Sequence, residues 1–139
     1  MNINSAIVYG AKVLKNRFFK NPYLDSEILM TNVIKKDRKY VLLNYKKVLA
    51  NEDLNSFKKL INKRLSGNPI AYLINKKFFW ESEFAVSNET LIPRPDTELV
   101  VQKVLEITAY KKNLNILDIG VGSGCILLSI LKERKSFYG

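Results

Sequence analysis

The stretch ILDIGVGSGCILL (residues 116–128) places three glycines at alternate positions directly after an apolar run. The apolar core of that run, Ile116 and Leu117 with Ile119, predicts a buried parallel strand. Residues 126–131, after the glycines, have the composition of a helix that packs onto this strand. A strand, a glycine-rich turn and a helix N-terminus in this order form a nucleotide-type site. The stretch therefore predicts an α/β unit with a ligand at its turn.

The glycines and the aspartate before them have separate expected roles. Gly120 and Gly122 permit backbone angles and close contacts that a Cβ atom would block, so they let a ligand approach the main chain. Gly124 lets the following helix lie close to the strand. Asp118, at the carboxyl end of the predicted strand, can hydrogen-bond the turn or a cationic ligand.

The spacing of the glycines discriminates among ligands. A dinucleotide fingerprint that began at Gly120 would have its third small residue at position 125, which is Cys125. The observed spacing, D-x-G-x-G-x-G, resembles motif I of the class I methyltransferases, which bind S-adenosylmethionine. We expect S-adenosylmethionine as the ligand, with a dinucleotide and a purely structural turn as the alternatives.

The first half of the chain has the periodicity of short amphipathic helices. Pro22 is placed to begin the second helix, and Asp37 to cap a third over residues 40–43. Asn51 is placed as the N-cap of the fourth helix, which Gly67 ends. The apolar positions expected on the helix faces are Ile3, Ile7, Ala11, Leu14 and Phe18, then Leu24, Ile28 and Leu29, and last Leu54, Phe57, Ile61 and Leu65. The pattern predicts a small helical bundle.

Two segments connect this bundle to the glycine turn. KKFFWESEFAV (76–86) is dense in aromatic residues with a polar break, which predicts a β-hairpin. In LIPRPDTELVV (91–101) two prolines flank Arg94, and Pro95 suits the first position of a helix. The apolar face expected on that helix consists of Val100, Val104 and Ile107. At the other end, SFYG (136–139) is placed to begin a second strand.

Composition excludes several classes of protein. The 139 residues are 47% hydrophobic and 26% charged, as in globular proteins, and no apolar run approaches the roughly 18 residues of a membrane span. The N-terminus lacks the pattern of a signal peptide. Cys125 is the one cysteine and the chain has no histidine, so no metal site is expected. We expect a cytoplasmic protein.

The positive charge is concentrated in the first half of the chain. Residues 1–75 contain 14 Lys and Arg against 5 Asp and Glu, whereas residues 76–139 contain 9 against 8. This asymmetry indicates an acidic partner or a nucleic acid for the first half. The alternative is compositional bias, since the chain is rich in Lys, Asn and Ile together, as an AT-rich genome imposes.

Four segments carry a resemblance to a known family: GNPIAYL (67–73), FFWESEFAV (78–86), LIPRPDTE (91–98) and LDIGVGSGCI (117–126). Together they resemble the HemK/PrmC family, which methylates the side-chain amide (N5) of the glutamine in the GGQ tripeptide of peptide chain release factors. The resemblance implies an α plus α/β fold in three parts. These are a helical substrate-recognition domain at 1–72, a β-hairpin connection at 73–93, and the start of a class I, Rossmann-like methyltransferase domain at 94–139.

The resemblance also implies where S-adenosylmethionine would bind. The residues concerned are Gly120, Val121, Gly122, Ser123, Gly124, Asp118 and Arg94. For Arg94 the alternative is a surface ion pair with Glu98. The NPPY motif with which the family grips the acceptor amide does not occur in the 139 residues, so no catalytic residue is assigned. We expect a fragment that is inactive alone, with release factors as partners of the longer enzyme.

Other functions stay open at this point. A class I methyltransferase of similar architecture could act on a ribosomal-protein glutamine or on a nucleic-acid amino group. The basic half could instead be a non-enzymatic module on RNA, with an affinity that falls steeply with salt. A dehydrogenase-type nucleotide binder is disfavoured by the glycine spacing.

Overall fold

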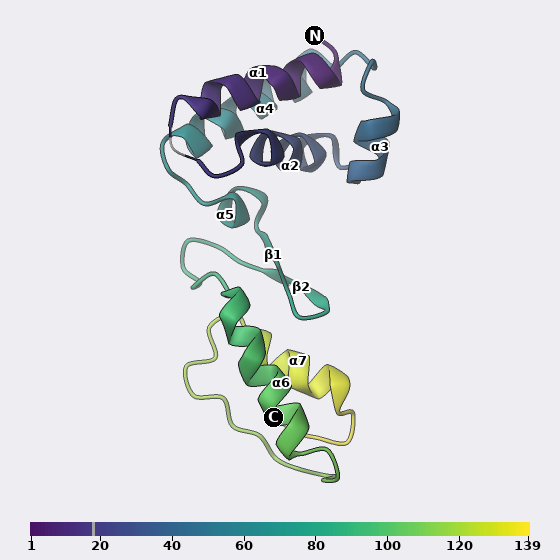
Figure 1. Cartoon of the computed structure of the whole chain (residues 1–139), viewed down its shortest axis with the longest axis vertical. Coiled ribbons are helices and arrows are strands. Elements are labelled where there is room, and N and C mark those ends of the chain that lie inside the picture. The colour runs from purple at the N-terminus through teal and green to yellow at the C-terminus, as the bar shows by residue number, and fades with distance from the viewer. Residues whose placement is uncertain (18) are drawn as a thin grey trace. The chain divides into compact units, whose positions relative to one another are not determined.

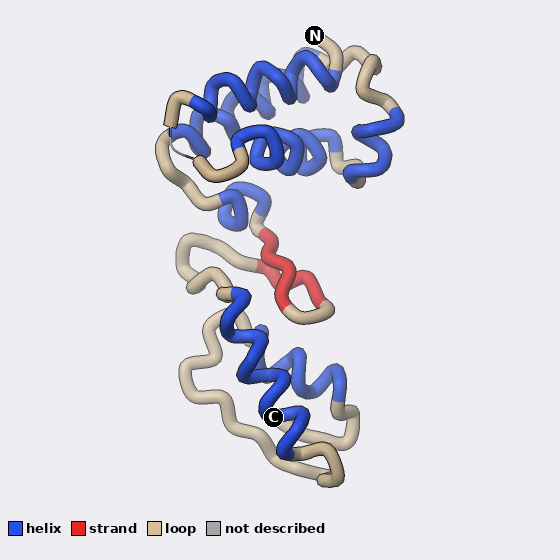
Figure 2. The backbone as a smooth tube through the Cα atoms, in the orientation of Figure 1, coloured by secondary structure: helices blue, strands red, loops and turns tan. Residues whose placement is uncertain are grey.

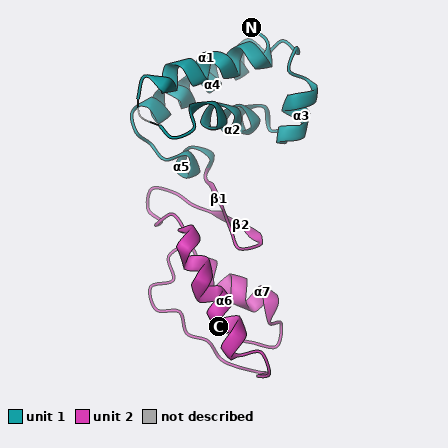
Figure 3. Cartoon of the chain, in the orientation of Figure 1, with its two compact units in different colours: residues 1–74 teal, residues 75–139 magenta. Residues whose placement is uncertain are grey.

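The computed structural model describes residues 1–17 and 19–139 (Figure 1). The chain divides into two compact units, residues 1–74 and 75–139, which are called unit 1 and unit 2 (Figure 3). The elements of unit 1 are α1 (Ile3–Lys15), α2 (Pro22–Ile34), α3 (Arg38–Leu43), α4 (Asn51–Leu65) and α5 (Ile70–Ile74). Those of unit 2 are β1 (Lys76–Phe79), β2 (Ser82–Ala85), the 3-10 helix η1 (Pro95–Thr97), α6 (Glu98–Ile107) and α7 (Cys125–Glu133).

Unit 1 is a helical bundle in which α1, α2 and α4 share one core. The predicted stripes of α1 and α4 supply most of it: Ile3, Ile7, Leu14, Phe57 and Ile61 are buried. Leu54 and Leu65 are partly buried against the same core. Ala11 is half-buried, and Phe18 lies outside the described residues. The predicted bundle and two of its apolar faces are confirmed.

The face predicted for α2 is wrong in part. Leu24 is exposed and Ile28 half-buried, whereas α2 buries Ser26, Glu27 and Met30 beside Leu29. The reason is that α2 packs against several helices at once, and Ser26 lies against Gly10 of α1, where a Cβ atom would come within 2.5 Å of its hydroxyl oxygen. The Ser26 hydroxyl donates to the Ile7 carbonyl at 2.8 Å, which satisfies this buried polar group.

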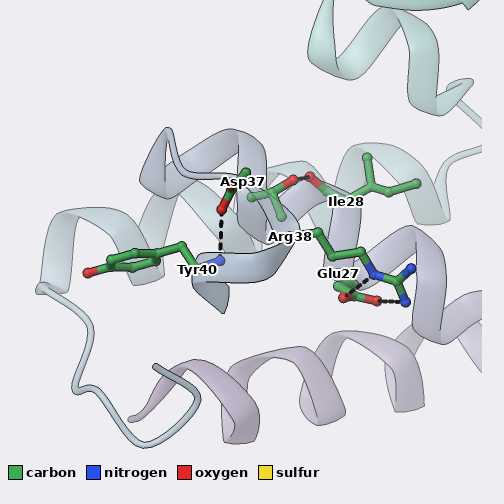
Figure 4. Close-up of polar contacts among 6 residues, drawn as sticks. Glu27, Ile28, Asp37, Arg38 and Tyr40 are labelled. Atoms are coloured by element: carbon green, nitrogen blue, oxygen red, sulfur yellow. Dashed lines mark hydrogen bonds and ion pairs between the residues drawn. The ribbon is translucent and has the colours of Figure 1, made fainter. Parts of the chain in front are cut away.

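Glu27, also buried, is neutralised by an arginine of the next helix. Arg38 approaches its carboxylate with two nitrogens, at 2.8 and 3.2 Å (Figure 4). This hydrogen bond, together with the negative charge of Glu27, raises the pKa of Arg38. Asp37 accepts from the Tyr40 N–H at 2.7 Å in the same view, which confirms the predicted cap of α3.

The other helix ends are mostly as predicted. Pro22 is the first residue of α2, and α4 ends at Leu65, two residues before Gly67 with its φ of +102°. The N-cap prediction for α4 is wrong by one residue. Ala50 is the cap because its carbonyl accepts from the Leu54 N–H at 3.0 Å, so Asn51 already belongs to the helix. α5 was not predicted.

Unit 2 begins with the predicted hairpin, drawn red in Figure 2. β1 and β2 are antiparallel, with Phe79 opposite Ser82, so Trp80 and Glu81 form the turn. Trp80 has a φ of +53°, as the first position of a tight hairpin turn requires. Phe79 and Phe84 pack edge to face and enter a core with Val101 of α6 and Ile130 of α7. The hairpin places its turn beside both helices.

Two predictions for unit 2 are wrong. The buried strand at 116–119 does not form: Leu117 is 82% and Ile119 89% exposed. Ile116 alone of its three apolar residues is partly buried against the core of unit 2. Among the described residues the pairing beside this segment is one parallel bridge, Asn115 with Tyr138, and without further neighbouring strands Leu117 and Ile119 are not covered. That bridge agrees with the expectation of a second strand at 136–139.

On α6 the buried apolar residue is Val101, whereas Val100 and Ile107 of the predicted face are exposed. Pro95 opens the η1 turn, and this turn continues into α6. The helix meets its neighbour α7 through the face that carries Val101 and the half-buried Val104. The buried face of α6 is therefore shifted by about one residue from the predicted one.

Candidate functional site

The glycine turn lies between the Asn115 bridge and α7. Gly120, Gly122 and Gly124 have φ angles of +86°, +54° and +74°, a region that only glycine enters readily. The Gly124 N–H donates to the Val121 carbonyl at 2.8 Å, and the Gly124 carbonyl then accepts from Leu128 in the first turn of α7. The glycines are thus explained by the backbone path from the bridge into the helix.

The three glycines differ in how closely other atoms surround them. A Cβ atom built on Gly120 would meet no described atom within 4 Å, and one on Gly122 would meet the Gly120 carbonyl oxygen at 3.8 Å. A Cβ on Gly124 would lie 3.2 Å from the Leu128 side chain. Gly124 is therefore packed, whereas the main chain at Gly120 and Gly122 is open to a ligand.

Asp118 supplies a carboxylate beside this open backbone. Its Oδ2 atom is shielded from solvent and has no hydrogen-bond partner among the residues that the structure describes. A buried carboxylate oxygen left without a donor costs free energy, on the order of 1–3 kcal/mol. Asp118 is therefore suited to accept a hydrogen bond from a cationic or N–H-bearing ligand.

The N-terminus of α7 adds the opposite polarity. The first N–H groups of a helix point outward and carry the positive end of the helix dipole. A carboxylate at Asp118 and the N–H groups at the start of α7 would complement a ligand that carries both charges, as an amino acid does. Of the other predicted cofactor residues, Val121 is exposed and Ser123 half-buried in the same turn.

Arg94 lies apart from this turn in its interactions. It is exposed and caps η1, where its carbonyl accepts from the Thr97 N–H at 3.0 Å. Within the described parts of the chain no hydrogen bond or ion pair joins its guanidinium to the turn or to Glu98. The structure thus places Asp118 next to residues 120–124, and among the described residues it gives the Arg94 side chain no hydrogen bond or ion pair with them.

Glu98 has a different role, which its position in the sequence did not predict. Its Oε1 atom accepts from the Trp80 N–H at 2.8 Å, and the Trp80 indole N–H donates to Glu133 at 3.0 Å. Lys132 reaches the same hairpin turn, with its Nζ atom 2.9 Å from the Glu81 carbonyl oxygen. These contacts fasten the hairpin turn to α6 and α7, and so hold the helix that begins at the glycine turn. The one feature of the sequence that could have pointed to Glu98 is its place at the end of the segment LIPRPDTE (91–98).

No helix that the structure describes combines the length and apolarity needed to cross a membrane.

Comparison with known proteins gives the same result for both halves of the chain. Residues 5–74 match the family model of the PrmC N-terminal domain. A release factor glutamine methyltransferase from Buchnera aphidicola subsp. Baizongia pistaciae is 40% identical over 134 residues, which cover 96% of this chain and 48% of that protein. The enzyme of the same name from Buchnera aphidicola subsp. Schizaphis graminum is 41% identical over 131 residues, or 94% and 46% of the two chains.

A third relative with that name, from Aliivibrio fischeri, is 40% identical over 113 residues, which cover 81% of this chain and 39% of the relative. The chain thus spans about half the length, or less, of the curated relatives that it matches. The match to the PrmC N-terminal domain begins within α1 and runs to the end of α5, and the relatives extend the similarity through the hairpin and the glycine turn. The chain belongs to the HemK/PrmC family of release factor glutamine methyltransferases.

Proposed function

We propose that this chain is part of an enzyme that transfers a methyl group from S-adenosylmethionine to the side-chain amide of the GGQ glutamine in peptide chain release factors. The names of the relatives support the reaction and the acceptor. The observation that carries the cofactor assignment is the open glycine backbone beside the unpaired, buried Oδ2 atom of Asp118. In this proposal the enzyme works in the cytoplasm, with release factors as its protein partners.

The residues of the turn fit the cofactor by charge and by space. Asp118 would accept from the amino group of the methionine part, and the N–H groups at the start of α7 would attract its carboxylate. Gly120, Gly122 and the neighbouring Val121 and Ser123 would border the ligand. When bound, S-adenosylmethionine supplies a sulfonium methyl group as the electrophile for the glutamine nitrogen. Arg94 is proposed to act beside this site.

The parallel bridge between Asn115 and Tyr138 supports a Rossmann-like beginning for residues 94–139. Two parallel strands joined by a helix form the repeating unit of such folds, and here α7 lies in the sequence between the two residues of the bridge. We assign residues 1–72 to substrate recognition and residues 73–93 to the hairpin connection. Orientation and electrostatic stabilisation are the expected sources of catalysis, because an amide nitrogen is a poor nucleophile.

The 139 residues alone are proposed to be inactive. Their sequence holds no NPPY, so nothing assigned in the chain grips the acceptor amide. A methyl-transfer assay with the purified chain, a release factor and labelled S-adenosylmethionine should therefore give no turnover. Turnover above the no-enzyme background would contradict this part of the proposal.

The function itself is tested in a chimera. The part of the Baizongia-symbiont Buchnera enzyme that matches this chain is replaced by residues 1–139, and methylation of the GGQ peptide is followed by mass spectrometry. We expect methylated release factor, and an increase of about tenfold or more in the KM for S-adenosylmethionine when Asp118 is changed to Asn. A folded chimera that leaves the glutamine unmodified would contradict the proposed function.

A further inference from the structure

Two hollows lie next to each other along the outer side of α1, since Val8 and Lys12 line both. The larger has a volume of about 470 Å³ and extends to Phe19 and Pro22. The smaller, of about 330 Å³, extends toward Asn4 at the start of the helix. Both belong to unit 1, on the side of α1 away from its buried stripe. We call the two hollows together the α1 groove.

The lining of the α1 groove is apolar with cations at its exposed positions. Ala11, Phe19 and Pro22 are half-buried in the larger hollow. The exposed side chains of Lys12, Lys15 and Arg17 line it as well. Of the residues that the structure describes, no Asp or Glu lines either hollow. The groove therefore combines apolar surface with uncompensated positive charge.

One wall of the groove is held in place from behind. The Phe19 ring lies under the guanidinium of Arg64, with 4.1 Å from the ring centroid to its central carbon. Arg64 is fixed by Asp25 at 2.8 Å, and both of these side chains are mostly buried. A wall that is already ordered lowers the entropy that a ligand must offset.

We propose that the α1 groove binds a segment of a partner protein in which an apolar side chain is flanked by carboxylates. The apolar side chain would enter the larger hollow, and the carboxylates would pair with Lys12, Lys15 or Arg17. A nucleic acid is the weaker match, because its phosphates would gain nothing from the apolar lining. That this partner is the release factor rests on the proposed function. That the groove selects apolar and acidic side chains rests on its lining alone.

The test is selection of random 16-residue peptides on phage against the purified 139-residue chain, followed by affinity measurements on the enriched peptides. We expect enriched peptides that combine apolar residues with Asp or Glu. Their dissociation constants should rise about tenfold with Lys12→Glu/Lys15→Glu. The matched control, Lys39→Glu/Lys46→Glu, changes the net charge equally at exposed positions away from the groove and should have no effect.

A second pair of variants tests the apolar part. Val8→Ser should raise the dissociation constants of the peptides a few-fold. Val48→Ser, at an exposed valine outside the groove, should leave them unchanged. Circular dichroism checks that each variant is folded, and Lys12→Gln/Lys15→Gln replaces the charge reversal if that variant unfolds. The inference would be overturned if no acidic peptides were enriched, or if the control variants weakened peptide binding as much as the groove variants. Binding of a U-rich RNA oligonucleotide in the groove, without binding of acidic peptides, would overturn it as well.

The outcome is separable from that of the proposed function, because S-adenosylmethionine binding is measured on the same samples. A chain that binds the cofactor but no acidic peptide contradicts only the proposal for the α1 groove. A chain that binds acidic peptides in the groove but no cofactor contradicts the proposed function alone.

Discussion

Unit 1 and unit 2 differ in how their apolar side chains are covered. In unit 1 the stripes of α1 and α4 face a shared core, and Phe57 is fully buried. In unit 2 the apolar residues on either side of Asp118 are largely exposed, Leu117 and Ile119 among them. A helix can bury its face against helices that are close in the sequence, whereas a strand depends on partner strands. Stability is therefore expected to reside in unit 1, and the candidate cofactor site in a less covered region.

The largest expected effect comes from truncating a core phenylalanine. Phe57→Ala should lower the free energy of unfolding by about 3–5 kcal/mol, because Phe57 is fully buried. Phe78→Ala, in the hairpin of unit 2, should lower it by less than about 1 kcal/mol, since that ring is 66% exposed. Urea unfolding followed by circular dichroism measures both. Equal losses would contradict the burial described for these two rings.

A smaller effect is expected where Gly10 of α1 lies against Ser26 of α2. A Cβ atom at Gly10 would lie 2.5 Å from the Ser26 hydroxyl oxygen and 2.8 Å from Ile61. Ser26 cannot move without losing its bond to Ile7, so Gly10→Ala should destabilise unit 1 by about 1–2 kcal/mol despite the better helix propensity of alanine.

Gly120→Ala is the matched control for this glycine. Here the φ of +86° strains the backbone, but no described atom within 4 Å would clash with the new Cβ atom. Thermal unfolding followed at a helical wavelength should therefore shift for Gly10→Ala and leave the transition of unit 1 unchanged for Gly120→Ala. The reverse order would contradict the packing described for α1 and α2.

Within unit 2, Glu98→Ala should lower the free energy of unfolding by about 1–2 kcal/mol, because the Trp80 N–H would lose its acceptor. Trp80 is the one tryptophan of the chain, so its fluorescence reports the change directly. Glu89→Ala removes an exposed carboxylate nearby in the sequence and serves as the control. If both variants unfold at the same urea concentration, Glu98 does not fasten the hairpin.

The smallest effect concerns a surface ion pair of α6. The hydrogen bond and charge of Lys103, 2.8 Å away, lower the pKa of Glu106. A lowered pKa stabilises the folded state above the unfolded pKa, and this contribution is lost as pH falls through the folded pKa. In Lys103→Met the Glu106 pKa, followed by NMR titration, should return toward its ordinary value. An unchanged pKa would show that the pair is not formed in solution.

Much of unit 1 could be predicted because its signals are local. Pro22, Asp37 and the stripe of α4 each depend on residues within a few positions, and all three predictions are confirmed. The packing of α2 could not be predicted in the same way. Periodicity counts large apolar residues, whereas the contact between Gly10 and Ser26 depends on small ones.

Unit 2 was harder to predict because its signals depend on distant partners. The apolar run at 116–119 has the composition of a buried strand, but composition does not supply the neighbouring strands that would cover it. The glycine turn was predictable, since its three positive φ angles are a backbone requirement. The unpaired oxygen of Asp118 was not, because its burial depends on how the whole unit folds around it.

The central claim is that Asp118 and the glycine turn hold S-adenosylmethionine. The most direct measurement is a ¹H–¹⁵N NMR titration of the 139-residue chain with S-adenosylmethionine, which detects weak binding residue by residue. We predict shifts concentrated at residues 118–125, and their loss in Asp118→Asn. Resonances that stay unchanged at saturating ligand, or shifts confined to unit 1, would contradict the claim.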